Sequence, residues 1–274
     1  MHPVLFEFDV WGITVSVMSY TFFLFAAVLA VGLIGLLLAA HEGVPRTSAM
    51  GVIIAAIVAA LIGARLMHRV TNPGFYADEP LRVLTLSREG LSLYGGMLSA
   101  GAAGYLVCRL LGLDPWRMAD LVTPGLGAGI AVCRIGCFLN GCCYGRPTEL
   151  PWGVKVAPDT VDCASRTLLG SFGVAAWDGP THPLQLYELL AALLSVAVVV
   201  VILRRHIAPG VAFVTFVGLL TTYRLVVLPL AQPRTGRIFD LVLYSLLILA
   251  SAIAVIVRSG STYAPVPRPS RERR

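Results

Sequence analysis

Seven runs of apolar residues, each about 19 to 21 residues long, dominate this 274-residue chain. A helix needs about 20 apolar residues to cross the ~30 Å hydrocarbon core of a bilayer, because it rises about 1.5 Å per residue. Only 13% of the residues are charged and 57% are hydrophobic, which excludes a soluble globular protein. We therefore predict an all-α integral membrane protein with transmembrane helices near 20–40, 49–69, 91–111, 119–139, 184–203, 210–230 and 239–257.

The basic residues between these runs predict the orientation. If the N-terminus lies outside, the inner segments hold ten Lys and Arg residues in 38 positions, and the outer segments hold seven in 91. Positive charge concentrates on the cytoplasmic side of membrane proteins, so we predict the N-terminus outside and the C-terminus in the cytoplasm. The net charge of +6 needs no nucleic-acid partner, because basic inner loops meet anionic lipid.

Two segments lie outside the predicted spans. The segment near 140–183 contains Gly, Pro and both signs of charge and is long for a connection, which indicates an ordered outer cap. The C-terminal segment 259–274 is basic and rich in proline, which is typical of a disordered tail. We therefore predict one membrane domain, 1–258, followed by a cytoplasmic tail.

Two arginines lie well inside the predicted spans. Arg134 is five residues and Arg224 six residues from the outer ends of their spans, a depth of about 8–9 Å. A guanidinium stays protonated, so each requires an anionic or hydrated partner within the membrane. Glu188 could pair with either arginine, and the remaining positive charge indicates an anionic ligand such as a phospholipid headgroup.

Other polar residues gather in the same outer half of the spans, which favours a polar cavity open to the outer leaflet. Two simpler explanations apply to some of them. Arg65, His68 and Arg69 could extend to the headgroups, and Tyr20 and Tyr94 could be interfacial tyrosines. The glycines of the third and fourth spans permit close helix packing, which is the better explanation for most of them.

Cysteines are concentrated at the outer end of the fourth span, at 133, 137, 142 and 143. Their spacing does not match a zinc knuckle, so we predict no metal site. A disulfide from Cys142 or Cys143 to Cys163 is reasonable in an oxidising compartment. Cys108 and Cys133 are expected to be small apolar side chains in the core.

Four segments resemble the prolipoprotein diacylglyceryl transferase family. They read HPVLF at 2–6, EGLSLYGG at 89–96, RIGCFLNGCCYGRPT at 134–148 and HPLQLYE at 182–188. The resemblance implies an enzyme of the bacterial inner membrane, without a cofactor, that moves the diacylglyceryl group of phosphatidylglycerol. The acceptor would be the lipobox cysteine thiol next to a prolipoprotein signal peptide, and glycerol phosphate would be released. The other expected partners are membrane lipids.

The resemblance also implies roles for individual residues. Arg134 and Arg224 would hold the phosphate and stabilise the charge that develops on it, and Tyr94 and His182 are the candidates for proton transfer. The implied substrate-binding residues are Tyr20, Asn140, Gly145, Gln185, Tyr187 and Glu188.

The chain departs from the family pattern at the positions that would handle protons. Tyr94 stands where a histidine is expected, and Leu228 stands where a carboxylate is expected. Cys137 and Cys142 replace an asparagine and a glutamate. Two alternatives therefore accompany the transferase: a paralogue that uses another acceptor or lipid, and a non-catalytic protein that binds or transports phospholipid.

Overall fold

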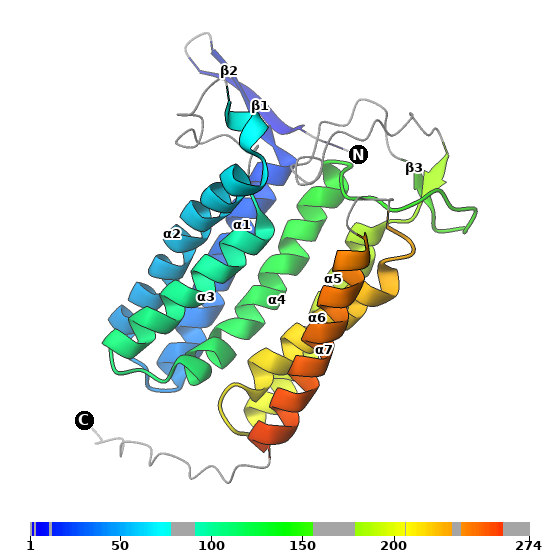
Figure 1. Ribbon diagram of the computed structural model, residues 1–274. Helices are drawn as coiled ribbons and strands as arrows, with labels where there is room; N and C mark the ends of the chain where they lie inside the picture. The colour runs from blue at the N-terminus through cyan, green and yellow to red at the C-terminus, as the bar shows by residue number, and fades with distance from the viewer. Residues whose placement is uncertain are drawn as a thin grey trace.

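The computed structural model describes residues 2, 4–10, 13–77, 91–155, 179–205, 207–231 and 237–259. Within these residues, seven α-helices lie side by side in a bundle (Figure 1). Each covers most of one predicted span, and no boundary differs from the prediction by more than four residues. The helices are α1 (Ser19–His41), α2 (Arg46–Thr71), α3 (Leu93–Leu110), α4 (Pro115–Leu139), α5 (Leu184–Arg204), α6 (Val211–Val227) and α7 (Arg237–Ser259).

Five of the helices, α1, α2, α4, α5 and α7, are long and apolar enough to cross a membrane. This confirms a helical, multi-pass membrane protein. The remaining two are less apolar or shorter: α3 has 18 residues with four glycines among them, and α6 has 17 residues. Seven crossings therefore stay a prediction for these two helices.

The helices alternate in direction. We call the end of the bundle at which α1 begins the upper end, as drawn in Figure 1, and the opposite end the lower end. The second, fourth and sixth helices finish at the upper end, and the third, fifth and seventh begin there. Residues far apart in the sequence therefore meet at the upper end, and this brings the candidate site together.

Helix α4 lies at the centre of the bundle, between the helices before it and those after it (Figure 1). Half of its most apolar window is buried in the protein, compared with 6% for α7. Glycines allow this close packing: a Cβ at Gly125 would lie 2.8 Å from the Val31 carbonyl oxygen, and one at Gly129 would lie 3.0 Å from the Ala27 carbonyl oxygen. These two glycines therefore allow α4 to pack closely against α1, whereas Gly127 faces Val196 of α5 and Phe216 of α6.

The apolar core has two parts. One lies between α1, α2, α3 and α4, where Cys108 is buried as predicted. The other lies between α5 and α6 and contains Val199 and Phe216. Most other large apolar side chains are exposed on the surface of the bundle, as expected for helices that face lipid.

The lower end is fixed by contacts that the sequence did not indicate. Asp120 of α4 accepts hydrogen bonds from the backbone N–H groups of Gly210, at 2.6 Å, and Phe213, at 2.8 Å. A carboxylate here satisfies donors at the start of α6 that its own helix leaves open. Arg258 at the end of α7 lies 3.8 Å from the ring centroid of Trp116, a cation–π contact that joins α7 to α4.

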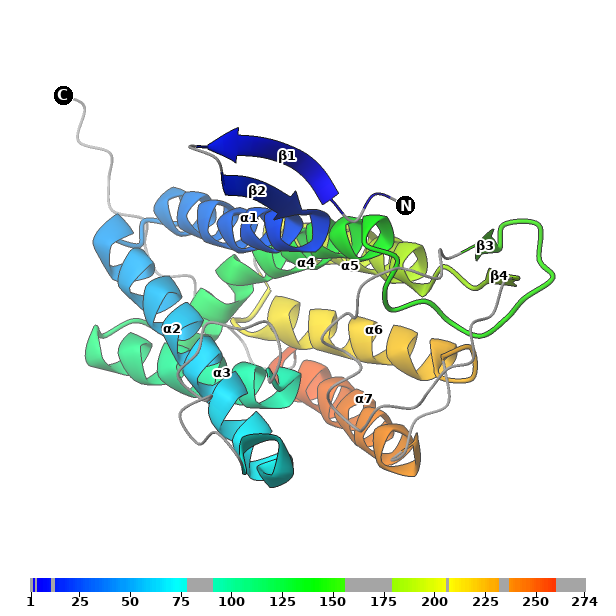
Figure 2. The ribbon, with the colours of Figure 1, turned by 90° about the horizontal axis from the view of Figure 1, so that it is seen from above.

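An N-terminal hairpin corrects the purely helical prediction. Strands β1 (Val4–Val10) and β2 (Ile13–Met18) pair antiparallel and extend from the upper end of the bundle, where β2 leads into α1 (Figure 1 and Figure 2). Polar residues at alternate positions pair across the strands, for example Glu7 with Ser16. A second small sheet joins β3 (Val154–Lys155) to β4 (Pro180–Thr181). The fold is therefore helical with two small sheets.

The end of α2 also differs from the simplest expectation. A short 3₁₀ helix, η1 (Pro73–Tyr76), follows α2. His68 is fully buried, and its Nδ1 lies 3.0 Å from the Tyr76 hydroxyl. The idea that His68 extends to the headgroups is therefore wrong, because this histidine packs inside the protein beside η1.

Parts of the predicted outer cap are described, at 140–155 and 179–183. Besides the pairing of β3 with β4, the backbone N–H of Arg146 donates to the carbonyl of Leu230 at 2.8 Å. The connection between α4 and α5 therefore packs against the residues that follow α6. The rest of the cap, Cys163 and the tail from 260 lie outside the described residues.

Candidate active site

Three charged side chains from three helices meet at the upper end of the bundle. Arg134 lies near the end of α4, Arg224 near the end of α6, and Glu188 in the first turns of α5. The fourth and sixth helices run toward the upper end and the fifth runs away from it. The alternating direction of the helices therefore places these residues at one level.

Glu188 bridges the two arginines. Its Oε2 lies 3.0 Å from Nη2 of Arg134, and its Oε1 lies 2.5 Å from Nη2 of Arg224. The exposed fraction of the side chain is 12% for Glu188, 19% for Arg134 and 36% for Arg224. The sequence predicted that Glu188 pairs with one of the two arginines. In the structure it pairs with both, because each carboxylate oxygen binds a different guanidinium.

This arrangement leaves one positive charge in excess. Each guanidinium carries five N–H donors, and the bridge to Glu188 uses one nitrogen of each arginine. The other donors are held in a fixed orientation, which suits the oxygens of a phosphate or carboxylate. We call Arg134, Glu188 and Arg224 the arginine clamp.

The end of α4 is a Schellman turn. Gly141 has a φ of 71°, and its N–H donates to Phe138, while the N–H of Cys142 donates to the carbonyl of Cys137 at 3.0 Å. This turn brings the side chains of its first and last residues together. Asn140, predicted to bind substrate, is the buried capping residue of the helix.

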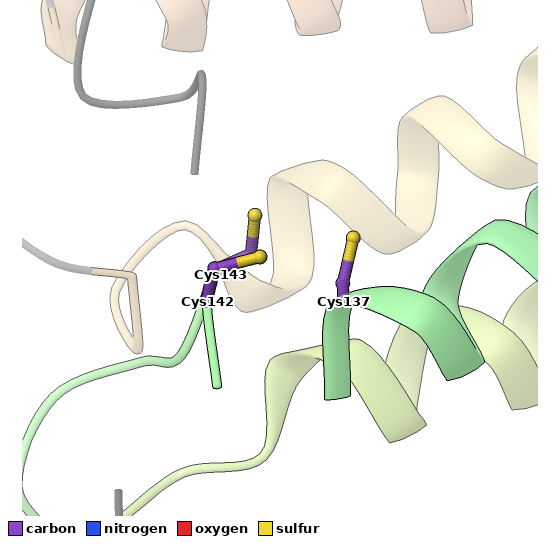
Figure 3. A group of neighbouring side chains, drawn as sticks. All are labelled: Cys137, Cys142 and Cys143. Carbon is purple, nitrogen blue, oxygen red and sulfur yellow. The ribbon is translucent and has the colours of Figure 1, made fainter. Parts of the chain in front are cut away.

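Three sulfur atoms meet at this turn. The Sγ atoms of Cys137, Cys142 and Cys143 all lie within 4.8 Å of one another (Figure 3). Nη1 of Arg134 lies 3.8 Å from the Sγ of Cys137, so the cluster adjoins the arginine clamp. No disulfide joins the cysteines of the described residues. The sequence showed that cysteines are concentrated here, but it did not show which three converge, because this depends on the shape of the turn.

Two of the predicted substrate-binding residues hold the chain around the clamp. The buried amide of Gln185 donates from Nε2 to the Cys142 carbonyl at 2.5 Å, which ties α5 to the turn. The N–H of Gly145 donates to the His182 carbonyl at 2.8 Å. A Cβ at Gly145 would lie 2.7 Å from the Leu230 carbonyl oxygen, so only glycine fits without movement.

His182 and Tyr187 form a separate polar group at the start of α5. Nδ1 of His182 lies 3.4 Å from the Tyr187 hydroxyl, which accepts a hydrogen bond from Nε1 of Trp152 at 2.7 Å. The backbone of His182 also bonds to Arg146. These contacts orient the first turn of α5, from which Glu188 reaches the clamp.

The two predicted tyrosines lie on other helices at the same end. The hydroxyl of Tyr94, in the first turn of α3, lies 3.5 Å from Oδ1 of Asp240 in α7. Tyr20 lies in the first turn of α1. The sequence did not single out Tyr223, whose hydroxyl donates to the Leu184 carbonyl at 3.1 Å beside Arg224.

A second feature of the upper end is an apolar pocket that contains none of the clamp residues. It has a volume of about 280 Å³ and lies between the end of α6 and the start of α7. Leu225, which follows Arg224 in the sequence, and Leu228 line it together with Pro229, Arg237, Ile238 and Leu241. The upper end of the bundle therefore contains both a pair of arginines and an apolar pocket.

A sequence profile of the prolipoprotein diacylglyceryl transferase family matches residues 3–258. The chain belongs to this family. The similar curated proteins include phosphatidylglycerol–prolipoprotein diacylglyceryl transferases from three bacteria. The Geobacter sulfurreducens protein is 33% identical over 181 residues, 64% of this chain and 62% of the relative. The Thermus thermophilus protein is 32% identical over 173 residues, 59% and 61% respectively. The Finegoldia magna protein is 29% identical over 156 residues, 55% and 62% respectively.

The matched region spans about three fifths of the length of these relatives. The residues at which this member of the family departs from the family pattern can now be located in the structure. Cys137 and Cys142, where the resemblance implies an asparagine and a glutamate, are both in the cysteine cluster. Leu228, where it implies a carboxylate, lines the apolar pocket.

Proposed function

We propose that this protein transfers the diacylglyceryl group of phosphatidylglycerol to the lipobox cysteine thiol of prolipoproteins, the first step of bacterial lipoprotein maturation. The observation that carries this proposal is the arginine clamp with its surplus positive charge. Family membership and the names of the similar curated proteins support the reaction.

The clamp suits the leaving group of this reaction. The cysteine sulfur forms a bond to the terminal carbon of the glyceryl group, the bond from that carbon to the phosphate oxygen breaks, and glycerol phosphate leaves. Negative charge on the phosphate rises as the bond breaks. Arg134 and Arg224, held by Glu188, supply donors that do not have to reorganise when this charge develops.

The thiol proton needs an acceptor, and a guanidinium cannot accept it. Glu188 is the carboxylate that contacts both arginines. Each oxygen of the Glu188 carboxylate has a further lone pair besides the one directed at its arginine, so an incoming thiol can reach the carboxylate while the clamp stays closed. We therefore assign proton acceptance to Glu188, and we give Tyr94 and His182 supporting roles at the edge of the site.

The membrane setting follows the charge distribution of the sequence. We place the upper end, with the N-terminus and the connection between α4 and α5, on the outer side of the bacterial inner membrane. Phosphatidylglycerol of the outer leaflet would then have its phosphate at the clamp and an acyl chain near the apolar pocket. Labelling of single cysteines with a membrane-impermeant maleimide from outside tests this orientation.

Complementation tests the reaction. In a strain depleted of its own transferase, the wild-type protein should restore growth, and Arg134→Ala should not. With radiolabelled phosphatidylglycerol and a lipobox peptide, Arg134→Lys should lower kcat/KM roughly 100-fold, because lysine keeps the charge but loses the planar fork.

The alternatives give different results in the same assays. A well-expressed wild-type protein that neither rescues growth nor consumes phosphatidylglycerol would overturn the proposal. Lipid movement between liposomes without turnover would indicate a transport protein. Turnover with another acceptor, but none with the lipobox peptide, would indicate a paralogue.

A further inference from the structure

The cysteine cluster of Cys137, Cys142 and Cys143 has no part in the proposed transfer. Two of its members are buried and Cys143 is half-buried, and all three sulfurs lie within 4.8 Å of one another. Figure 3 shows the sulfurs of Cys142 and Cys143 next to each other, on the side of the turn that faces Cys137. Three thiols on seven consecutive residues therefore converge on one point.

The backbone around the cluster is held in place from two directions. The Schellman turn fixes Cys137 relative to Cys142, and Gln185 of α5 donates to the Cys142 carbonyl. Cys143 has a φ of 63°, an uncommon conformation for a residue with a side chain. This conformation redirects the chain directly after Cys142, so that two adjacent cysteines both reach the cluster.

We propose that Cys137, Cys142 and Cys143 bind one zinc ion as thiolates. At a Zn–S distance of about 2.3 Å, three sulfurs of a tetrahedral site lie about 3.8 Å apart. The observed sulfur–sulfur separations reach 4.8 Å, and side-chain movements of about 1 Å would shorten them to this value. Binding releases the three thiol protons to solvent, and the fourth position stays open to water or to another thiol.

Charge favours zinc at this place. One Zn²⁺ with three thiolates carries a single negative charge, and Nη1 of Arg134, 3.8 Å from the Cys137 Sγ, can donate to one of these thiolates. Thiolate donors select zinc over the hard cations magnesium and calcium. A disulfide fits less well, because it needs sulfurs about 2.05 Å apart and leaves the third thiol unused. The structure therefore changes the expectation drawn from linear spacing.

Zinc content of the purified full-length protein tests this inference. The protein in detergent, kept reduced with a phosphine, should bind one zinc ion per chain as measured by mass spectrometry of the metal. Cobalt should replace it and give intense thiolate-to-metal charge-transfer absorption. Cys137→Ser, Cys142→Ser and Cys143→Ser should each weaken binding roughly tenfold or more.

Two variants serve as matched controls. Cys133→Ser removes a sulfur one turn earlier on α4, and Cys108→Ser removes a buried sulfur of the core between α1, α2, α3 and α4. Both should bind zinc like the wild type. Gel filtration of every variant shows whether it remains folded. The number of zinc ions bound per wild-type chain tests the inference even if a variant does not fold.

Three results would overturn the inference. They are a wild-type protein that takes up no zinc, a triple serine variant that binds zinc unchanged, and a Cys137–Cys142 disulfide trapped by alkylation of intact cells. The zinc measurement is independent of the proposed transfer. Zinc binding without complementation would refute only the transferase, and complementation without zinc would refute only the metal site.

Discussion

Replacing Glu188 by alanine should destabilise the protein mainly by isolating Arg134. The distances alone suggest the opposite, because Glu188 lies 2.5 Å from Arg224 and 3.0 Å from Arg134. Exposure decides the order. The Arg134 side chain is 19% exposed, whereas that of Arg224 is 36% exposed. An attraction between charges is several times stronger in the protein interior than in water.

These environments give different magnitudes. Removing the partner of a buried charge costs about 3 kcal/mol or more, which applies to Arg134. An ion pair at an exposed position contributes about 1 kcal/mol at most, and we apply this value to Arg224, the more exposed of the two arginines. We therefore expect Glu188→Ala to lower the free energy of unfolding by about 3–4 kcal/mol. Arg134→Ala should cost less, because Glu188 keeps Arg224 as its partner.

Two double variants show which arginine is destabilised by the loss of Glu188. Adding Arg134→Ala to Glu188→Ala removes the isolated charge and should restore about 2 kcal/mol. Adding Arg224→Ala to the same background should restore almost nothing. Unfolding in mixed micelles with increasing SDS gives the free energies. Equal recovery from the two additions, or a larger recovery from Arg224→Ala, would refute the argument that burial outweighs distance.

Three further predictions use the same preparations. Gly145→Ala should cost about 1–3 kcal/mol, because its Cβ would lie 2.7 Å from the Leu230 carbonyl oxygen. Gly104→Ala, which has open space at this position, should denature like the wild type. Asp120→Asn can accept only one of the two N–H groups at the start of α6 through its single carbonyl oxygen, and should cost about 1–2 kcal/mol by thermal denaturation. Tyr94→Phe should lower transfer activity less than about tenfold, whereas a loss of 100-fold or more would make its hydroxyl an acid or base of the reaction.

The sequence predicted the helices well because the bilayer imposes their length. Every predicted span overlaps one helix, and the two intramembrane arginines lie at the same end of the bundle. The pairing of Glu188 with an arginine could also be predicted from the sequence, since a buried charge requires a partner. These features follow from composition and from counting residues along a helix.

Other features depend on contacts that a linear pattern does not contain. The hairpin was missed because Phe6, Glu7 and Phe8 alternate over too few residues to stand out beside seven long apolar runs. The capping of α6 by Asp120 joins residues 90 positions apart. Such contacts are fixed by how the helices pack, so a single sequence gives no local signal for them.

The cysteine substitutions show how the structure changes the meaning of a sequence difference. Along the sequence, Cys137 and Cys142 look like two separate losses from the family pattern of proton-handling residues. The Schellman turn places their side chains together, and Cys143 completes the group. A cysteine at one of these positions alone would be a single thiol beside Arg134, whereas the three together offer the donor set that we propose for zinc. With zinc bound, the two departures from the family pattern would belong to one site.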